Sequence, residues 1–390
     1  LMVSASARGA LHVWHLEKRA RLTSVSAAHA GGIASAHFVR GQPQLLTLGS
    51  VDNALKVWIF DRPDGSARLL RSRSGHSAPP AVVRFHSDSV LAGGIPAGQA
   101  YLLSGGSDRT VRQASVWSAQ QDCEYSQTRE ENKHSMHTSL EERRLPPLVG
   151  LASSQVKERE WASVVTCHAG SPHAYTWHTT NRALAPHTLK LKGGATVTAV
   201  AVSTCGNFAL VAGEDGSLEK FNLQSGARRA STSTARHTSA IRGLSVEALS
   251  QYVYSGGADG TIRSWRLTDL SHLATLDATS PVAVLRHQRD SELLAAACDD
   301  TAVRIFDMST CRLVRLLRGH RNTISDLDWS ADGRWIISVS LDSTLRIVDV
   351  PSGVAIGWYR LDDPAVSITV SPQGEYIATA HASNTALCVW

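Results

Sequence analysis

A turn followed by a short run of alternating residues recurs along this chain, and this repetition constrains the fold more than any other feature. The clearest copy is SGGADGTIRSW, residues 255–265, in which Ala258-Asp259-Gly260 supplies the turn and the following residues alternate up to Trp265. Glycine and aspartate favour tight turns, and a period of two is typical of a half-buried strand. Each copy therefore predicts a β-hairpin.

Nine such copies can be aligned by their last residue. They end at Trp14, Trp58, Ala114, Trp177, Phe221, Trp265, Phe306, Val348 and Trp390. Most of the intervals between these endings are about 41 to 44 residues, which is the length of four short antiparallel strands with their turns, or one propeller blade. The two longer intervals indicate insertions. The sequence therefore predicts an all-β propeller.

The endings also predict how the chain divides. Those after Gly75-His76 fit one seven-bladed ring over residues 67–390, and the two earlier endings make residues 1–66 the last two blades of an upstream propeller. Pro79 and Pro80 are expected in the connection before the first strand of the ring, because proline donates no backbone hydrogen bond. Residues 118–145 show neither the alternation of a strand nor an apolar periodicity, so they are predicted to be an inserted, solvated loop.

The sequence alone does not show which strand closes the ring. The chain stops at Trp390 in a third strand, so the last blade is expected to lack an outer strand. Residues 68–72 could supply that strand, or they could complete the blade that ends at Trp58. The sequence does not decide between these two pairings.

The pattern resembles the WD-repeat family of β-propellers, in which a His, a Ser or Thr, an Asp and a Trp of each blade form a buried hydrogen-bonded set. Carried over by position, one set is complete and two lack the Trp. The complete set is His237, Ser255, Asp259 and Trp265; the others are His76, Ser104 and Asp108, and His320, Ser338 and Asp342. Recurrence at blade spacing, without a G-x-S-x-G elbow, favours a structural role over a catalytic triad.

Composition excludes several classes of function. No run of about 18 apolar residues predicts a membrane span. The six cysteines form no C-x-x-C pair and the 17 histidines form no H-E-x-x-H motif, so neither a metal site nor a disulfide framework is expected. No phosphate-binding glycine loop follows a strand, so no cofactor or small-molecule substrate is expected. We therefore expect no enzymatic activity.

Two arginine-rich windows are candidate surfaces for RNA or a partner protein, because forked guanidinium groups suit phosphate. The first window, residues 226–243, holds Arg228, Arg229, Arg236 and Arg242; the second window, residues 311–321, holds Arg312, Arg315, Arg318 and Arg321. A solvated outer strand protected by charge is the alternative for both. Neither window contains interleaved aromatic residues, so the sequence gives no support for base stacking.

Several longer stretches carry a narrower resemblance. RSGHSAPP at 73–80, RRLPPL at 143–148, STCGNFALV at 203–211, DLDWSADGRWIISVSLDSTLRIVDVPSG at 326–353 and SPQGEYIATAH at 371–381 are similar to the tandem WD-repeat proteins of the UTP-B subcomplex of the small-subunit processome, which associates with U3 small nucleolar RNA. The resemblance implies a non-catalytic nucleolar scaffold for rRNA processing and small-subunit assembly. It also implies other WD-repeat subunits of UTP-B and a precursor ribosomal RNP as partners. A substrate-recruiting adaptor of a ubiquitin ligase is the alternative.

Overall fold

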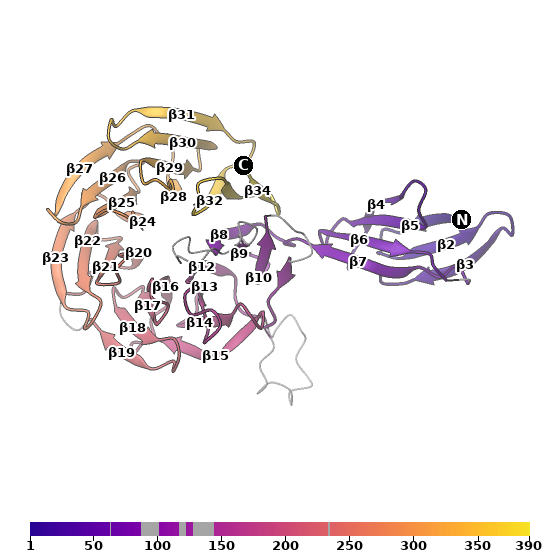
Figure 1. Ribbon diagram of the computed structural model, residues 1–390, viewed down its shortest axis with the longest axis horizontal. Helices are drawn as coiled ribbons and strands as arrows, with labels where there is room; N and C mark the ends of the chain where they lie inside the picture. The colour runs from indigo at the N-terminus through magenta and orange to yellow at the C-terminus, as the bar shows by residue number, and fades with distance from the viewer. Residues whose placement is uncertain (63, 87–100, 117–121, 128–143, 233–234) are drawn as a thin grey trace. The chain divides into compact units, whose positions relative to one another are not determined.

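The computed structural model describes the chain except for residues 63, 87–100, 117–121, 128–143 and 233–234 (Figure 1). The chain divides into two compact units, Leu1–Ala78 and Pro79–Trp390. Every regular element of the described residues is a β-strand. The predicted all-β fold is therefore confirmed.

The first unit contains two antiparallel sheets, with strand orders β1-β2-β3 and β4-β5-β6-β7. The strands are β1 (Met2–Ala5), β2 (Leu11–His15), β3 (Ala20–Val25), β4 (Ile33–Phe38), β5 (Gln44–Gly49), β6 (Ala54–Ile59) and β7 (Arg68–Ser74). Leu11, Ala28, Leu45 and Trp58 form the buried core of this unit. Within each sheet, every strand pairs with the next along the chain, as in successive hairpins.

In the second unit, the described strands β8 to β34 form seven antiparallel sheets arranged in a ring (Figure 1). The first four sheets contain β8 (Pro80–His86), β9 (Tyr101–Gly106), β10 (Val111–Ser115), β11 (Cys123–Glu124), β12 (Leu148–Ser153), β13 (Val164–His168), β14 (His173–His178), β15 (Ala183–Lys190), β16 (Val197–Val202), β17 (Phe208–Gly213), β18 (Leu218–Asn222), β19 (Arg228–Ser231), β20 (Ile241–Val246), β21 (Tyr252–Gly257), β22 (Thr261–Arg266) and β23 (His272–Asp277). The last three contain β24 (Val282–His287), β25 (Leu293–Cys298), β26 (Val303–Asp307), β27 (Arg312–Leu317), β28 (Ile324–Trp329), β29 (Trp335–Ser340), β30 (Thr344–Asp349), β31 (Ala355–Arg360), β32 (Ala365–Val370), β33 (Ile377–His381) and β34 (Leu387–Val389).

Burial changes from strand to strand within each sheet. The second strands, such as β21 and β25, are buried at every residue except the first, because neighbouring sheets cover both of their faces. The fourth strands, such as β27 and β31, are largely exposed at the rim. Apolar side chains therefore fill the spaces between sheets rather than a single centre.

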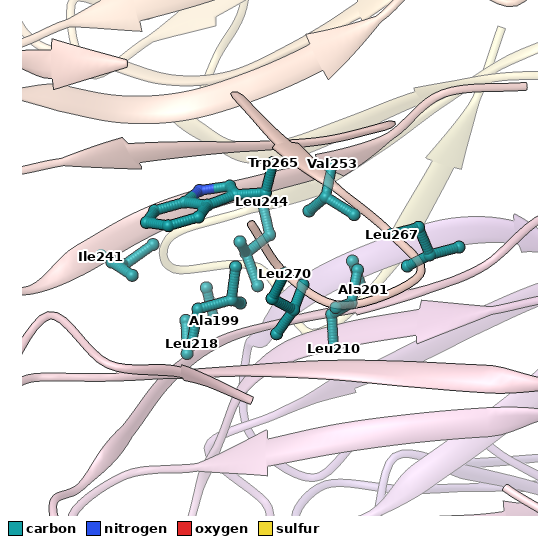
Figure 2. Close-up of a cluster of buried hydrophobic side chains, with 11 residues drawn as sticks. Ala199, Ala201, Leu210, Leu218, Ile241, Leu244, Val253, Trp265, Leu267 and Leu270 are labelled. Atoms are coloured by element: carbon teal, nitrogen blue, oxygen red, sulfur yellow. The ribbon is translucent and has the colours of Figure 1, made fainter. Parts of the chain in front are cut away.

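The space between the third and fourth sheets of the ring shows this packing (Figure 2). Leu210 and Leu218 of the third sheet meet Ile241, Val253 and Trp265 of the fourth in one cluster. Burying a side chain of this kind stabilises a protein by about 1.5–3 kcal/mol. Similar clusters join the other neighbouring sheets, so each sheet depends on the two beside it.

The seven endings predicted for the ring lie in or directly beside its third strands, while Trp14 lies in β2 and Trp58 in β6. The open question about residues 68–72 has an answer, since β7 pairs antiparallel with β6 from Ala54↔Ser74 to Ile59↔Arg68. This pairing puts residues 67–78 in the first unit, beyond the boundary expected after residue 66. The expectation for Pro80 was wrong, because β8 begins at this residue; a first strand position tolerates the missing N–H.

The expectation of a wholly solvated segment at 118–145 was also wrong in part. Cys123 and Glu124 form β11, which pairs with β10, and the Tyr125 side chain is buried beside Trp177. The Tyr125 hydroxyl donates a hydrogen bond to Gln113 Oε1 at 2.7 Å. Residues 118–121 and 128–143 of the predicted insertion lie outside the described residues.

Candidate functional site

The set of His237, Ser255, Asp259 and Trp265 is joined by hydrogen bonds in the fourth sheet of the ring. His237 Nδ1 lies 3.0 Å from Asp259 Oδ2, and Nε2 lies 2.8 Å from Ser255 Oγ. A carboxylate only accepts, so Nδ1 carries the proton and Nε2 accepts from the Ser255 hydroxyl. The Trp265 indole N–H donates to Ser255 Oγ at 2.8 Å. The set thus ties β21 and β22 to the loop that precedes β20.

The electrostatics of this set favour an ionised carboxylate and a neutral imidazole. Burial alone would raise the pKa of Asp259, but hydrogen bonds from Thr261 and Thr238, together with His237, lower it to about 2. Burial lowers the pKa of His237, and the nearby Asp259 offsets only part of that shift. Because the hydroxyl of Ser255 is committed to two neighbours and fully buried, it has no open path to a substrate.

His320, Ser338 and Asp342 repeat this arrangement in the sixth sheet. His320 Nδ1 lies 3.3 Å from Asp342 Oδ2, and Nε2 lies 2.8 Å from Ser338 Oγ. Hydrogen bonds from the Arg321 N–H and the Thr344 hydroxyl, together with His320, outweigh burial and lower the pKa of Asp342 to about 2. Val348 stands at the Trp position, so the hydroxyl receives no indole hydrogen bond.

The third predicted set is spread over both units. Ser104 and Asp108 are buried in the second unit, where Asp108 accepts hydrogen bonds from the Thr110 N–H at 3.1 Å and the Thr110 hydroxyl at 2.8 Å. His76 lies in the first unit, where its carbonyl oxygen accepts a hydrogen bond from Asn53 Nδ2 at 3.0 Å.

A further complete set occurs in the first unit, so the expectation of a single complete set was wrong. His29 Nδ1 lies 3.0 Å from Asp52 Oδ2, and Nε2 lies 2.9 Å from Thr47 Oγ1, to which the Trp58 indole also donates at 2.9 Å. The set uses Thr in place of Ser. The signal available in the sequence was Trp58 preceded by Thr at eleven residues and Asp at six.

Two other sheets contain a local variant of the set. In β13, His168 Nε2 bonds Thr166 Oγ1 at 3.0 Å, and the Trp177 indole donates to the same oxygen at 2.8 Å. His168 Nδ1 then donates to the Pro146 carbonyl at 2.6 Å instead of to an aspartate. Thr379, His381 and Trp390 repeat this pattern in the last sheet. The sequence signal is Thr-x-His with Trp eleven residues after the Thr.

The first arginine window is largely paired with acids. Arg228 lies 3.3 Å from Glu219, Arg242 lies 2.8 Å from Asp299, and Arg236 lies 3.9 Å from Asp215. Arg229 is exposed on β19. Since three of its four guanidinium groups have a carboxylate partner, this window offers little free positive charge.

The second arginine window differs. Among the described residues, none of Arg312, Arg315, Arg318 and Arg321 has a carboxylate within 4.0 Å of its guanidinium, and Arg315 donates instead to the Pro351 carbonyl at 2.8 Å. β27 is an outer strand, so its edge faces solvent. The positive charge here is available to a ligand.

Charged groups that the sequence analysis did not find line the central channel of the ring. The buried carboxylate of Asp326 on β28 accepts from Arg84 of β8 at 2.8 Å and from Arg286 of β24 at 3.0 Å. Ser367 of β32 donates to it at 2.8 Å. The two arginines outweigh burial and lower the pKa of Asp326. Only a correct alignment of the innermost strands would have revealed this cluster.

Cavities of about 340 and 790 Å³ lie along the channel, and Asp328 lines the smaller one. Burial raises the pKa of Asp328, although the carboxylate accepts a hydrogen bond from the Val370 N–H at 2.9 Å. Among the described residues, no three His, Cys, Asp or Glu side chains are grouped so that they could hold a metal ion. In the same part of the chain, no helix is long and apolar enough to cross a membrane.

Comparison with known proteins identifies the family. The model of the WDR36/Utp21 second beta-propeller domain matches residues 96–390. The chain belongs to the WDR36/Utp21 family. The whole chain is 34% identical to U3 small nucleolar RNA-associated protein 21 homolog of Schizosaccharomyces pombe and 32% identical to WD repeat-containing protein 36 of Homo sapiens. U3 small nucleolar RNA-associated protein 21 of Saccharomyces cerevisiae is 33% identical over 98% of the chain.

These matches confirm the predicted resemblance to a family of WD-repeat propellers that includes U3 small nucleolar RNA-associated proteins. The chain spans 41–43% of the length of these WDR36/Utp21 relatives. A solved structure of the computationally designed Ika8 protein aligns with a TM-score of 0.59 over 92% of this chain and 95% of that one. At 20% identity, this likeness concerns the fold alone.

Proposed function

We propose that this chain is part of a non-catalytic scaffold in the small-subunit processome, where it supports precursor rRNA processing and small-subunit assembly. The observation that carries the proposal is its similarity along 98–100% of its length to relatives named for U3 small nucleolar RNA. The UTP-B partners, a precursor RNP with U3 RNA and a nucleolar location are parts of the same proposal.

The geometry supports a scaffold rather than an enzyme. At Ser255, where serine, histidine and aspartate meet, the hydroxyl is buried and bonded to an indole N–H that a nucleophile would have to release. Asp326 in the channel is likewise committed to two arginines. A ring held by such contacts presents its loops and outer strands in fixed positions, which suits the simultaneous binding of several partners.

We also propose that the sheets of the first unit are the last blades of an upstream propeller. The complete set of His29, Thr47, Asp52 and Trp58 supports this, because the WD-repeat contacts recur there in full. β7 supplies the fourth strand of that sheet. By the same comparison, Ser104 and Asp108 are proposed as structural residues of the following blade.

The test is purification of the tagged full-length parent protein from cells at native expression. We expect U3 RNA, precursor small-subunit rRNA and other WD-repeat proteins to copurify, and depletion to lower mature small-subunit rRNA while the large subunit is spared. A purification dominated by ubiquitin-ligase subunits would support the adaptor alternative. A purification without ribosome precursors would refute the proposed function.

A further inference from the structure

The outer rim of the fifth and sixth sheets brings together features that lie far apart in the sequence. Arg315 of β27 donates to the Pro351 carbonyl in the turn between β30 and β31. The Arg346 guanidinium of β30 lies against Gly319, just after β27, so closely that a Cβ on this glycine would clash with it. The second arginine window therefore borders β30 and β31.

β31 contributes an exposed tryptophan to this rim. The Trp358 side chain is 64% exposed although it lies in the middle of a strand. Its register partner is Arg346, so these two side chains share one face of the sheet. Arg360 lies on that face as well, two residues further along β31. The face is turned toward the fifth sheet, because Arg346 contacts Gly319 on that side.

The charge of this face is one-sided. In the described part of the chain, neither Arg346 nor Arg360 has a carboxylate within ion-pair distance, and the same holds for Arg315. The Nε of Arg346 is buried and has no hydrogen-bond partner among the described residues. An exposed indole flanked by guanidinium groups is the combination that unpaired nucleotides require, with a base on the ring and phosphates on the arginines.

We propose that Trp358, Arg346, Arg360 and Arg315 form a binding surface for single-stranded RNA, which we call the β31 surface, with a base stacked on the Trp358 indole. The proposal deepens the function proposed above and rests on it for the source of the RNA. A duplex fits less well, because its bases are already stacked on one another and cannot lie against an indole. Sequence reasoning missed the surface because its tryptophan belongs to the sheet after the arginine window.

The test is binding of a fluorescein-labelled short oligouridylate to the purified chain, followed by anisotropy, with a duplex RNA of equal length as the comparison. Trp358→Ala should weaken binding of the single strand roughly tenfold or more, whereas Trp358→Phe should restore most of it. Tyr359→Ala is the matched control, because Tyr359 is 59% exposed on the same strand but points to the opposite face. It should leave the affinity unchanged.

The arginines have their own signature in the salt dependence. Replacing Arg315 and Arg346 with alanine should reduce the slope of log affinity against log salt by about 1.4, or about 0.7 for each lost phosphate contact to a single strand. The same double replacement at the acid-paired Arg228 and Arg242 should leave the slope unchanged.

Three outcomes would overturn the β31 surface: no binding by the unaltered chain, equal loss with Trp358→Ala and Tyr359→Ala, or crosslinks from the β31 peptide in the native complex to protein alone. The last outcome would assign the surface to a protein partner. Failure of the processome purification would remove the proposed source of RNA, yet the difference between Trp358→Ala and Tyr359→Ala would still be measured in vitro. The two failures are therefore distinguishable.

Discussion

The fourth and sixth sheets of the ring have the same strand order and the same His-Ser-Asp contacts, but they use tryptophan in opposite ways. In the fourth sheet Trp265 is 1% exposed and donates its N–H to Ser255. In the sixth sheet Val348 takes that place, and Trp358 lies exposed on the outer strand. The His-Ser-Asp contacts thus tolerate loss of the indole, while an outer strand can carry aromatic surface that packing does not require.

The two arginine windows also differ, in whether their guanidinium groups have acidic partners. Three of the four arginines in the first window meet Glu219, Asp215 and Asp299, whereas those of the second window, in the part of the chain that the structure describes, meet no carboxylate. Charge on an outer strand protects its edge in either case. Only unpaired charge remains available for a ligand, so a window of arginines in a sequence says little until its partners are known.

The largest expected difference between the sheets is in their tryptophans. Trp265→Ala should lower the free energy of unfolding by about 3–5 kcal/mol, because it empties a buried site and removes a hydrogen bond. Trp358→Ala should change it by less than about 0.5 kcal/mol, as an exposed substitution does. Urea unfolding followed by circular dichroism measures both. Equal losses would show that Trp358 packs in solution.

Asp259 and Asp342 occupy the same place in the two sheets and should contribute similar amounts to the free energy of unfolding. Asp259→Ala and Asp342→Ala are each expected to lower the free energy of unfolding by about 1–3 kcal/mol, because an imidazole and turn N–H groups lose their acceptor. Ser107→Ala, at an exposed position outside these two sets, is the control and should be close to neutral. Melting temperatures that match the control would refute a structural role for the two aspartates.

Lowering the pH should reduce the free energy of unfolding by less than the aspartate substitutions do. Burial holds the pKa values of His237 and His320 below 6.5, so the unfolded chain binds protons first as the pH falls. The associated stability is complete above about pH 6.5 and declines below it, while the aspartates, with pKa values of about 2, lose their contribution only below about pH 4.

Urea midpoints at pH 7.5 and pH 5.5 measure this effect. A His237→Asn, His320→Asn double variant should show a flatter dependence than the unaltered chain, since two of the titrating groups are gone. Greater stability at pH 5.5 would contradict the direction of the histidine pKa shifts.

The smallest expected effect concerns the arginine windows. Arg242→Ala should cost about 0.2–1 kcal/mol, because its ion pair with Asp299 is exposed, and the loss should shrink at high salt. Arg318→Ala, without a carboxylate partner among the described residues, should show no salt-dependent loss. If both variants lost the same salt-sensitive stability, the contrast between the windows would disappear.

The fold was accessible from the sequence because hairpin turns and alternation are local. Asp259-Gly260 followed by Thr261 to Trp265 encodes its own hairpin, and repetition at a fixed interval supplied the architecture. The segment at Tyr125 was missed because a two-residue strand is too short to show a period, and its burial depends on Trp177 from the neighbouring sheet.

The candidate sites were accessible only where the residues kept their usual spacing. His237 and His320 were found by position, whereas Thr47 lies eleven residues before its tryptophan instead of ten, and His168 reaches its threonine from within the same strand. The channel cluster and the β31 surface depend on residues from different sheets, such as Arg84 with Asp326. No local pattern in a single sequence records that kind of proximity.

The contact between Arg84 and Asp326 has a consequence for how the chain is made. These residues are separated by 242 positions, so on the ribosome the first inner strand of the ring emerges long before the carboxylate and Ser367 that bind its arginine. Until then the unfinished ring exposes apolar sheet faces that neighbouring sheets later cover. Nascent chains of this protein should therefore depend on chaperones until the last sheet has been synthesised and the ring can close.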